Sequence, residues 1–69
     1  MEMRYWDQKI RDYVTYETNL VPVKVDIKRH EVVLVFKQKE VEFRGLAEQE
    51  IIDKVQPLIP RKLVVECAP

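Results

Sequence analysis

The sequence contains no serine and has only one glycine, one cysteine and one histidine. The absence of serine excludes a serine nucleophile. A single glycine cannot build a glycine-rich phosphate loop, a dinucleotide-binding fingerprint or the Gly-x-x-Gly clamp of KH-type RNA-binding domains. A single cysteine excludes an internal disulfide, and a lone histidine without a Cys-x-x-Cys motif argues against a structural zinc site.

The chain also has no excess of charge of either sign, because 12 Lys and Arg residues balance 12 Asp and Glu residues. This balance argues against strong nonspecific attraction to nucleic acid or to an anionic membrane, and it permits self-association. The charged N-terminal segment has no apolar core of a signal peptide, and no run approaches the roughly 18 apolar residues of a membrane span. We therefore expect a cytoplasmic protein, without membrane partners, in which Cys67 is a reduced thiol.

The chain has 69 residues, of which 46% are hydrophobic, and this predicts one globular domain over residues 1–69. A domain of this size buries only about 60% of the surface of its unfolded chain. Small domains often add disulfides, a metal or oligomerisation. Since the first two are disfavoured here, oligomerisation is the stabilising route that remains.

Two segments carry apolar residues at helical spacing. The first covers residues 2–17, with Asn19 as its predicted stop, and the second covers residues 46–56, with Gly45 before it and Pro57 ending it. Their apolar stripes consist of Met3, Trp6, Ile10, Tyr13 and Val14 in the first helix, and Leu46 or Ala47, Ile51, Ile52, Val55 and Leu58 in the second.

Four segments show the alternation of strands: residues 21–28, 32–36, 40–44 and 62–67. The predicted order is α-β-β-β-α-β, in an α+β two-layer sandwich with both helices on one face of the sheet. The first three strands form an antiparallel meander. The fourth follows a crossover helix and pairs beside the first or the third strand.

Residues 32–36 are five consecutive apolar residues, so the strand they form is apolar on both faces. If Val32, Leu34 and Phe36 pack under the helices, with Phe43 on the next strand, then Val33 and Val35 lie on the open face. Charged neighbours surround them there: Lys24, Asp26, Lys28, Glu40, Glu42 and Arg44.

Two interpretations of these valines stay open. Strands tolerate partly exposed β-branched residues covered by charged stems. Alternatively, the valines belong to an interface, through the sheet face or an edge strand, with a second copy or with another protein. The interface hypothesis comprises Val33, Val35, Tyr5 and Tyr16, with Lys24 and Glu42 at the rim.

Catalytic, cofactor-binding and metal-binding residues are not predicted. Nothing brings Cys67 and His30 together, and ion pairing with nearby lysine and arginine explains Glu40 and Glu42. We therefore expect a non-enzymatic interaction module.

The alternative function is nucleic-acid binding through basic residues of the hairpin and its turns: Lys24, Lys28, Arg29, Lys37 and Lys39. RNA-binding sheets stack bases on exposed aromatic side chains, whereas Phe36 and Phe43 are expected in the core. Protein interaction is therefore the first hypothesis and nucleic-acid binding the second.

Overall fold

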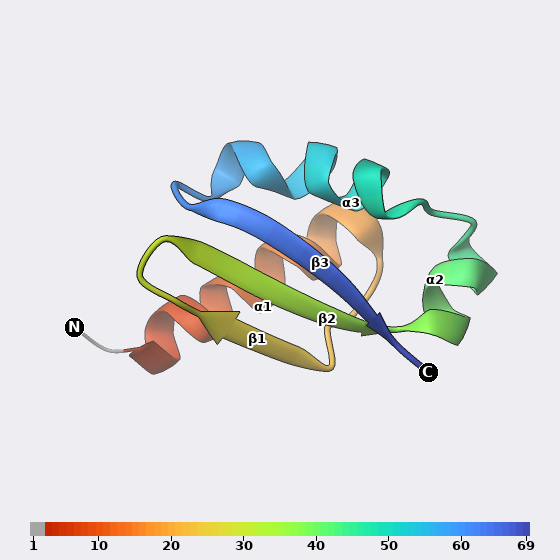
Figure 1. Cartoon of the computed structure of the whole chain (residues 1–69), viewed down its shortest axis with the longest axis horizontal. Coiled ribbons are helices and arrows are strands. Elements are labelled where there is room, and N and C mark those ends of the chain that lie inside the picture. The colour runs from red at the N-terminus through yellow and green to blue at the C-terminus, as the bar shows by residue number, and fades with distance from the viewer. Residues whose placement is uncertain (1–2) are drawn as a thin grey trace.

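The computed structural model describes residues 3–69, with side chains from Trp6 onward, and has an α+β architecture (Figure 1). The elements in chain order are α1 (Met3–Thr18), β1 (Lys24–Ile27), β2 (Glu31–Lys37), α2 (Gln38–Arg44), α3 (Glu48–Val55), the 3-10 turn η1 (Gln56–Leu58) and β3 (Lys62–Ala68). The predicted class is confirmed. The chain has three strands and three α-helices over the described residues, in place of four strands and two helices.

The sheet has the order β1-β2-β3. Strands β1 and β2 are antiparallel, with Asp26 opposite Val33, and β2 and β3 are parallel, with Val33 opposite Val64. The last strand therefore pairs with the second strand, and the prediction that it lies beside the first or third strand is wrong. Residues 38–44 do not form a strand, so they leave one edge of β2 free for β3.

Helices α1 and α3 cover one face of the sheet, as predicted. Figure 1 views the sheet from the other face, with α1 passing behind the strands and α3 running alongside β3. The covered face of β2 carries Val32, Leu34 and Phe36, all buried. The other residues of the core come from both helices, the flanking strands and the connections: Ile10, Val14, Leu20, Val25, Val41, Ile51, Val55, Ile59, Leu63 and Val65.

The segment predicted as a third strand, residues 40–44, lies in helix α2. Its residues are mostly strong helix formers, and Gln38 donates a hydrogen bond to Glu42 one turn later (2.9 Å). Val41 is buried, but the side chain of Phe43 is 85% exposed, so the expectation that Phe43 joins the core is wrong. The alternation of Val41 and Phe43 has only two members, too few to distinguish a strand from one helical turn.

A Schellman motif ends α2 at Gly45. Gly45 has φ +70°, its N–H donates to the carbonyl of Glu42 (3.0 Å), and the N–H of Leu46 donates to the carbonyl of Val41 (3.2 Å). These are the two hydrogen bonds of the motif, which favours glycine because of the left-handed backbone. Gly45 therefore ends α2 and is not the N-cap of the next helix, where Ala47 stands instead.

The other boundaries lie close to prediction, with one exception. Asn19 (φ +60°) follows the end of α1, and the predicted start of that helix at Glu2 lies outside the described residues. Pro57 stands in η1, directly after α3. The exception is β1, which begins only at Lys24, so Val21 and Val23 are exposed and do not point inward as predicted.

Among residues 3–69, none of the helices combines the length and the apolar character that a bilayer span requires.

Candidate interaction surface

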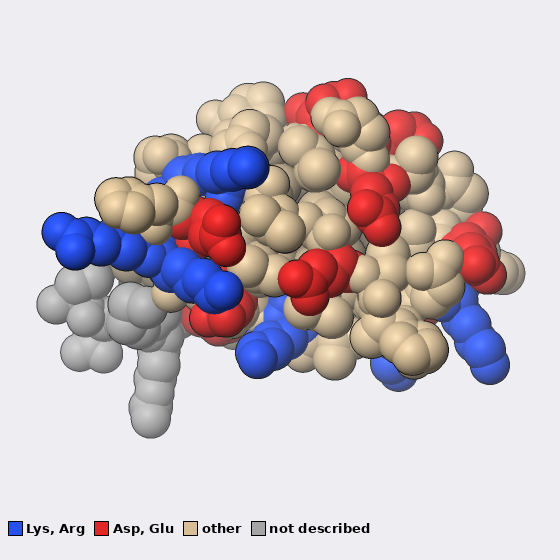
Figure 2. Space-filling model, in the orientation of Figure 1, with Lys and Arg blue, Asp and Glu red and all other residues tan. Residues whose placement is uncertain are grey.

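The face of the sheet opposite the helices, called the open face below, is built by register-matched side chains of all three strands. One row across the sheet is Asp26–Val33–Val64, and the next row is Lys24–Val35–Glu66. Glu31 and Lys62 form a third row toward the β1–β2 turn. The centre of the open face is therefore three valines, and its rim carries both signs of charge (Figure 2).

Val33 is nearly inaccessible although no helix covers it, since only 7% of the residue is exposed. It lies on the central strand, between Asp26 and Val64, and these neighbours shield it from the side. Val35 and Val64 are half-buried. The open face thus presents the flanks of Val35 and Val64, while Val33 forms its floor.

The structure divides the residues of the interface hypothesis among several places. Val33, Val35 and Lys24 share the open face. Tyr16 is 83% exposed but lies on α1, in the other layer, and Glu42 lies on α2, where Gln38 donates a hydrogen bond to it. Tyr5 precedes Trp6, the first residue whose side chain the structure describes. Because residues 40–44 are helical, the expectation that Glu40, Glu42 and Arg44 flank the valines on the sheet is wrong.

Sequence reasoning missed Val64 and Glu66 as members of the open face. The alternation of residues 62–67 already assigned both to the face opposite Leu63 and Val65. The pattern does not predict which strand pairs with β3. The pairing of β3 with β2 brings Val64 beside Val33.

A second apolar surface lies where α1 ends and α2 begins, and it is called the apolar end below. It consists of Tyr16, Val21, Val23 and Phe43, all exposed. Asn19 and Leu20 line a shallow depression together with Phe43, which shows that α2 lies against the connection between α1 and β1. Of the four, Phe43 is the one whose side chain lies beside this connection, at the depression with Asn19 and Leu20.

The basic residues of the nucleic-acid hypothesis lie at two opposite ends of the sheet. Lys28 and Arg29 belong to the β1–β2 turn, whereas Lys37 and Lys39 follow the far end of β2, and Lys24 is paired near that end, opposite Val35. The seven residues of β2 span about 20 Å. Arg61 and Lys62, which the hypothesis did not include, join the turn: Arg61 donates to the carbonyl of Lys28 (2.8 Å) and the N–H of Lys62 to that of His30 (3.3 Å).

Cys67 lies on the covered side near the end of β3, paired with Phe36. Burial raises the pKa of its thiol, and the carboxylates of Glu48 and Glu42 raise this pKa further. His30 stands before the opposite end of β2, so the fold does not bring Cys67 and His30 together. A thiol held in its protonated form is poorly suited to nucleophilic catalysis.

The outer edge of β3 is partly occupied by the chain itself. The side-chain oxygen of Gln56 accepts the N–H of Leu63 (2.9 Å), which points away from β2. The beginning of this edge is therefore not free to pair with another strand.

Comparison of the chain with protein-family models, with curated proteins and with solved structures gave no match. Within the described residues, no group of three or more His, Cys, Asp and Glu side chains is arranged to hold a metal ion.

Proposed function

We propose that this protein is a small, non-enzymatic interaction subunit of the cytoplasm that self-associates through its open face. One observation carries the proposal: Val33, Val35 and Val64 form an apolar centre on the side of the sheet that no helix covers. A domain of this size buries a small core, so an additional layer on the open face would stabilise it.

One row of charges on the open face is complementary to the same row of a second copy of the chain. Lys24 and Glu66 lie at opposite ends of one row, on either side of Val35. In a two-fold dimer whose axis lies in the interface along β2, β1 of one copy covers β3 of the other. Lys24 then faces Glu66 of the second copy, twice, because a two-fold interface repeats every contact. Val35 faces Val35 at the centre.

The size of the open face determines the strength of this dimer. Two strands of seven residues and one of four, about 4.8 Å apart and with about 3.3 Å per residue, present roughly 300 Å² per copy. The dimer would bury about 600 Å² in total, whereas stable interfaces bury more than about 1,000 Å². The proposed association is therefore weak and depends on concentration.

The test is light scattering over a concentration series. We expect the wild type to shift from monomer to dimer as its concentration rises, and Val35→Lys to remain a folded monomer. Lys24→Glu and Glu66→Lys should each weaken the dimer by placing like charges opposite one another. The double variant Lys24→Glu/Glu66→Lys should restore it, because the pair is then exchanged.

Tyr16→Lys is the matched control, because it changes an exposed apolar residue on the other layer. It should leave the dimer unchanged. A monomer at every concentration, or a double variant as weak as its parents, would overturn the proposal. If Tyr16→Lys abolishes the dimer and Val35→Lys does not, the apolar end and not the open face is the interface.

Nucleic-acid binding is a second candidate, supported by the convergence of Lys28, Arg29, Arg61 and Lys62 at one end of the sheet. Figure 2 shows positive side chains at that end with acidic ones between them, and further acidic side chains along α3. Binding of this kind would weaken steeply with salt. The absence of binding to RNA and DNA at low salt would exclude it.

A further inference from the structure

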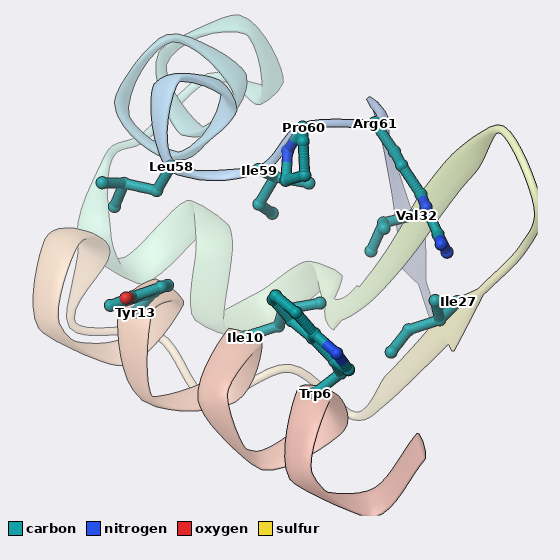
Figure 3. Close-up of a pocket in the computed structure, with 9 residues that line it drawn as sticks. All are labelled: Trp6, Ile10, Tyr13, Ile27, Val32, Leu58, Ile59, Pro60 and Arg61. Atoms are coloured by element: carbon teal, nitrogen blue, oxygen red, sulfur yellow. The ribbon is translucent and has the colours of Figure 1, made fainter. Parts of the chain in front are cut away.

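A pocket opens between α1 and the connection from α3 to β3, on the side of the molecule away from the open face (Figure 3). Its volume is about 180 Å³. Trp6, Ile10 and Tyr13 line it from α1, Ile27 and Val32 from the sheet, and Leu58, Ile59, Pro60 and Arg61 from the connection. Figure 3 shows Trp6, Ile10, Val32 and Ile59 around one space, with Leu58 and Tyr13 on one side of it and Arg61 and Ile27 on the other.

Hydrogen bonds hold the connection that forms the upper wall. The side-chain amide of Gln56 donates to the carbonyl oxygens of Ile59 (3.2 Å) and Arg61 (2.8 Å), while its oxygen accepts the N–H of Leu63. Arg61 Nη1 donates to the carbonyl of Lys28 (2.8 Å). The wall is therefore fixed before any ligand arrives, which reduces the entropic cost of binding.

The chemistry of the lining is apolar with one permanent positive charge. Among the side chains that the structure describes, from Trp6 onward, eight of the lining residues are apolar or aromatic, Arg61 is the ninth, and none is a carboxylate. A guanidinium has five N–H donors, and Arg61 uses one on Lys28, so others remain for a ligand. The Nζ atom of Lys9 lies 5.7 Å from the ring centre of Trp6 and 5.9 Å from that of Tyr13, which adds a second cation beside the aromatic wall.

We propose that this pocket binds a small carboxylate that carries a single aromatic ring. A cavity of about 150 Å³ lined by apolar side chains accommodates benzene, so the present pocket has room for one ring and a short acidic arm. The ring lies among Trp6, Ile10 and Val32. The carboxylate reaches Arg61, whose planar fork matches a carboxylate in two parallel hydrogen bonds.

The proposal is independent of self-association. The pocket lies between the helices and the covered side of the sheet, and none of its lining residues belongs to the open face. A ligand is therefore expected to bind equally well to monomer and dimer. Failure of one proposal leaves the other standing.

Trp6 is the only tryptophan of the chain, so its fluorescence reports on this pocket directly. The probe is phenylacetate, titrated into the full chain. We expect a saturable change in fluorescence, and a much weaker one with phenylacetamide, which has the same shape without the charge. Arg61→Gln should weaken phenylacetate binding about tenfold or more, whereas Arg61→Lys, which keeps the charge, should lose less.

Arg29→Gln is the matched control, because it removes a neighbouring positive charge that does not line the pocket. It should leave phenylacetate binding unchanged. The absence of a saturable change at millimolar phenylacetate, or equal binding by the wild type and Arg61→Gln, would overturn the proposal. Tighter binding of N-acetylphenylalaninamide than of phenylacetate would also overturn it, since the pocket would then receive an aromatic side chain of a partner protein.

Discussion

The two faces of β2 are buried by different means. On the covered face, Val32 is 2% exposed because helices lie over it. On the open face, Val33 is 7% exposed with no layer above it, and only its neighbours on β1 and β3 shield it. A three-stranded sheet has one strand with neighbours on both sides, so this lateral shielding is available to β2 alone. Val32 and Val33 therefore have similar exposed fractions but are packed differently.

The pair Val32→Ala and Val33→Ala tests this difference most strongly, since the same side chain is truncated on adjacent positions of one strand. We expect Val32→Ala to cost about 2–3 kcal/mol, because burial is lost and the pocket that Val32 lines beneath α1 is enlarged. Val33→Ala should cost about 1 kcal/mol, since flanking side chains and solvent can occupy the space. Urea unfolding measures both. Equal losses would show that the two faces are packed alike.

The next prediction concerns Gly45, the left-handed residue that ends α2 in the connection between β2 and the covering helix α3. Gly45→Ala should destabilise the fold by about 1–2 kcal/mol, the cost of a left-handed backbone for a residue with a Cβ. Nothing lies within 4 Å of the added Cβ, so the loss is conformational and not steric. Gly45→Asn is the control and should cost less, because asparagine tolerates this conformation. Thermal unfolding of both variants gives the comparison.

The smallest expected effect is at Cys67, which is partly buried on the covered side of the sheet near the end of β3. Burial raises the pKa of this thiol, with Glu48 adding to the shift. The pH profile of its alkylation should therefore lie above that of an unfolded peptide. Glu48→Gln should lower the midpoint, and Glu50→Gln should not. As the pH rises past about 8.5, the unfolded chain loses its thiol proton first, so this residue makes the folded state less stable at alkaline pH. An unshifted profile would contradict the assignment.

The sequence pattern identifies the elements whose periodicity extends over several members. The end of α1, helix α3 and the five apolar residues of β2 lie where the pattern predicts. The prediction failed at residues 40–44, where two apolar residues fit a strand and a helical turn equally well. The combination of Val41, Gly45 and Leu46 is the signal that would have identified a helix ending at a Schellman motif.

For the candidate surface as well, the sequence pattern predicts local features but not contacts between segments that are distant in sequence. Alternation alone assigns Val33 and Val35 to one face, because a strand fixes this locally. It does not reveal that β3 lies beside β2, which adds Val64 and shields Val33. The pocket depends on three segments that are distant in sequence, so no local pattern announces it.

The parallel pairing of β2 with β3 also has a consequence for how the chain reaches its native state. The β1–β2 hairpin closes over three residues, Lys28, Arg29 and His30, whereas β3 can align with β2 only after the whole of residues 38–61 has been brought back. Contacts between distant positions form late, because closing a long loop costs entropy before it is rewarded. We therefore expect the hairpin to assemble first, with one edge of its longest and most apolar strand unpaired. Until β3 pairs with β2, the unpaired edge of β2 can pair with a strand of another chain. Once β3 occupies this edge, such mispairing is blocked.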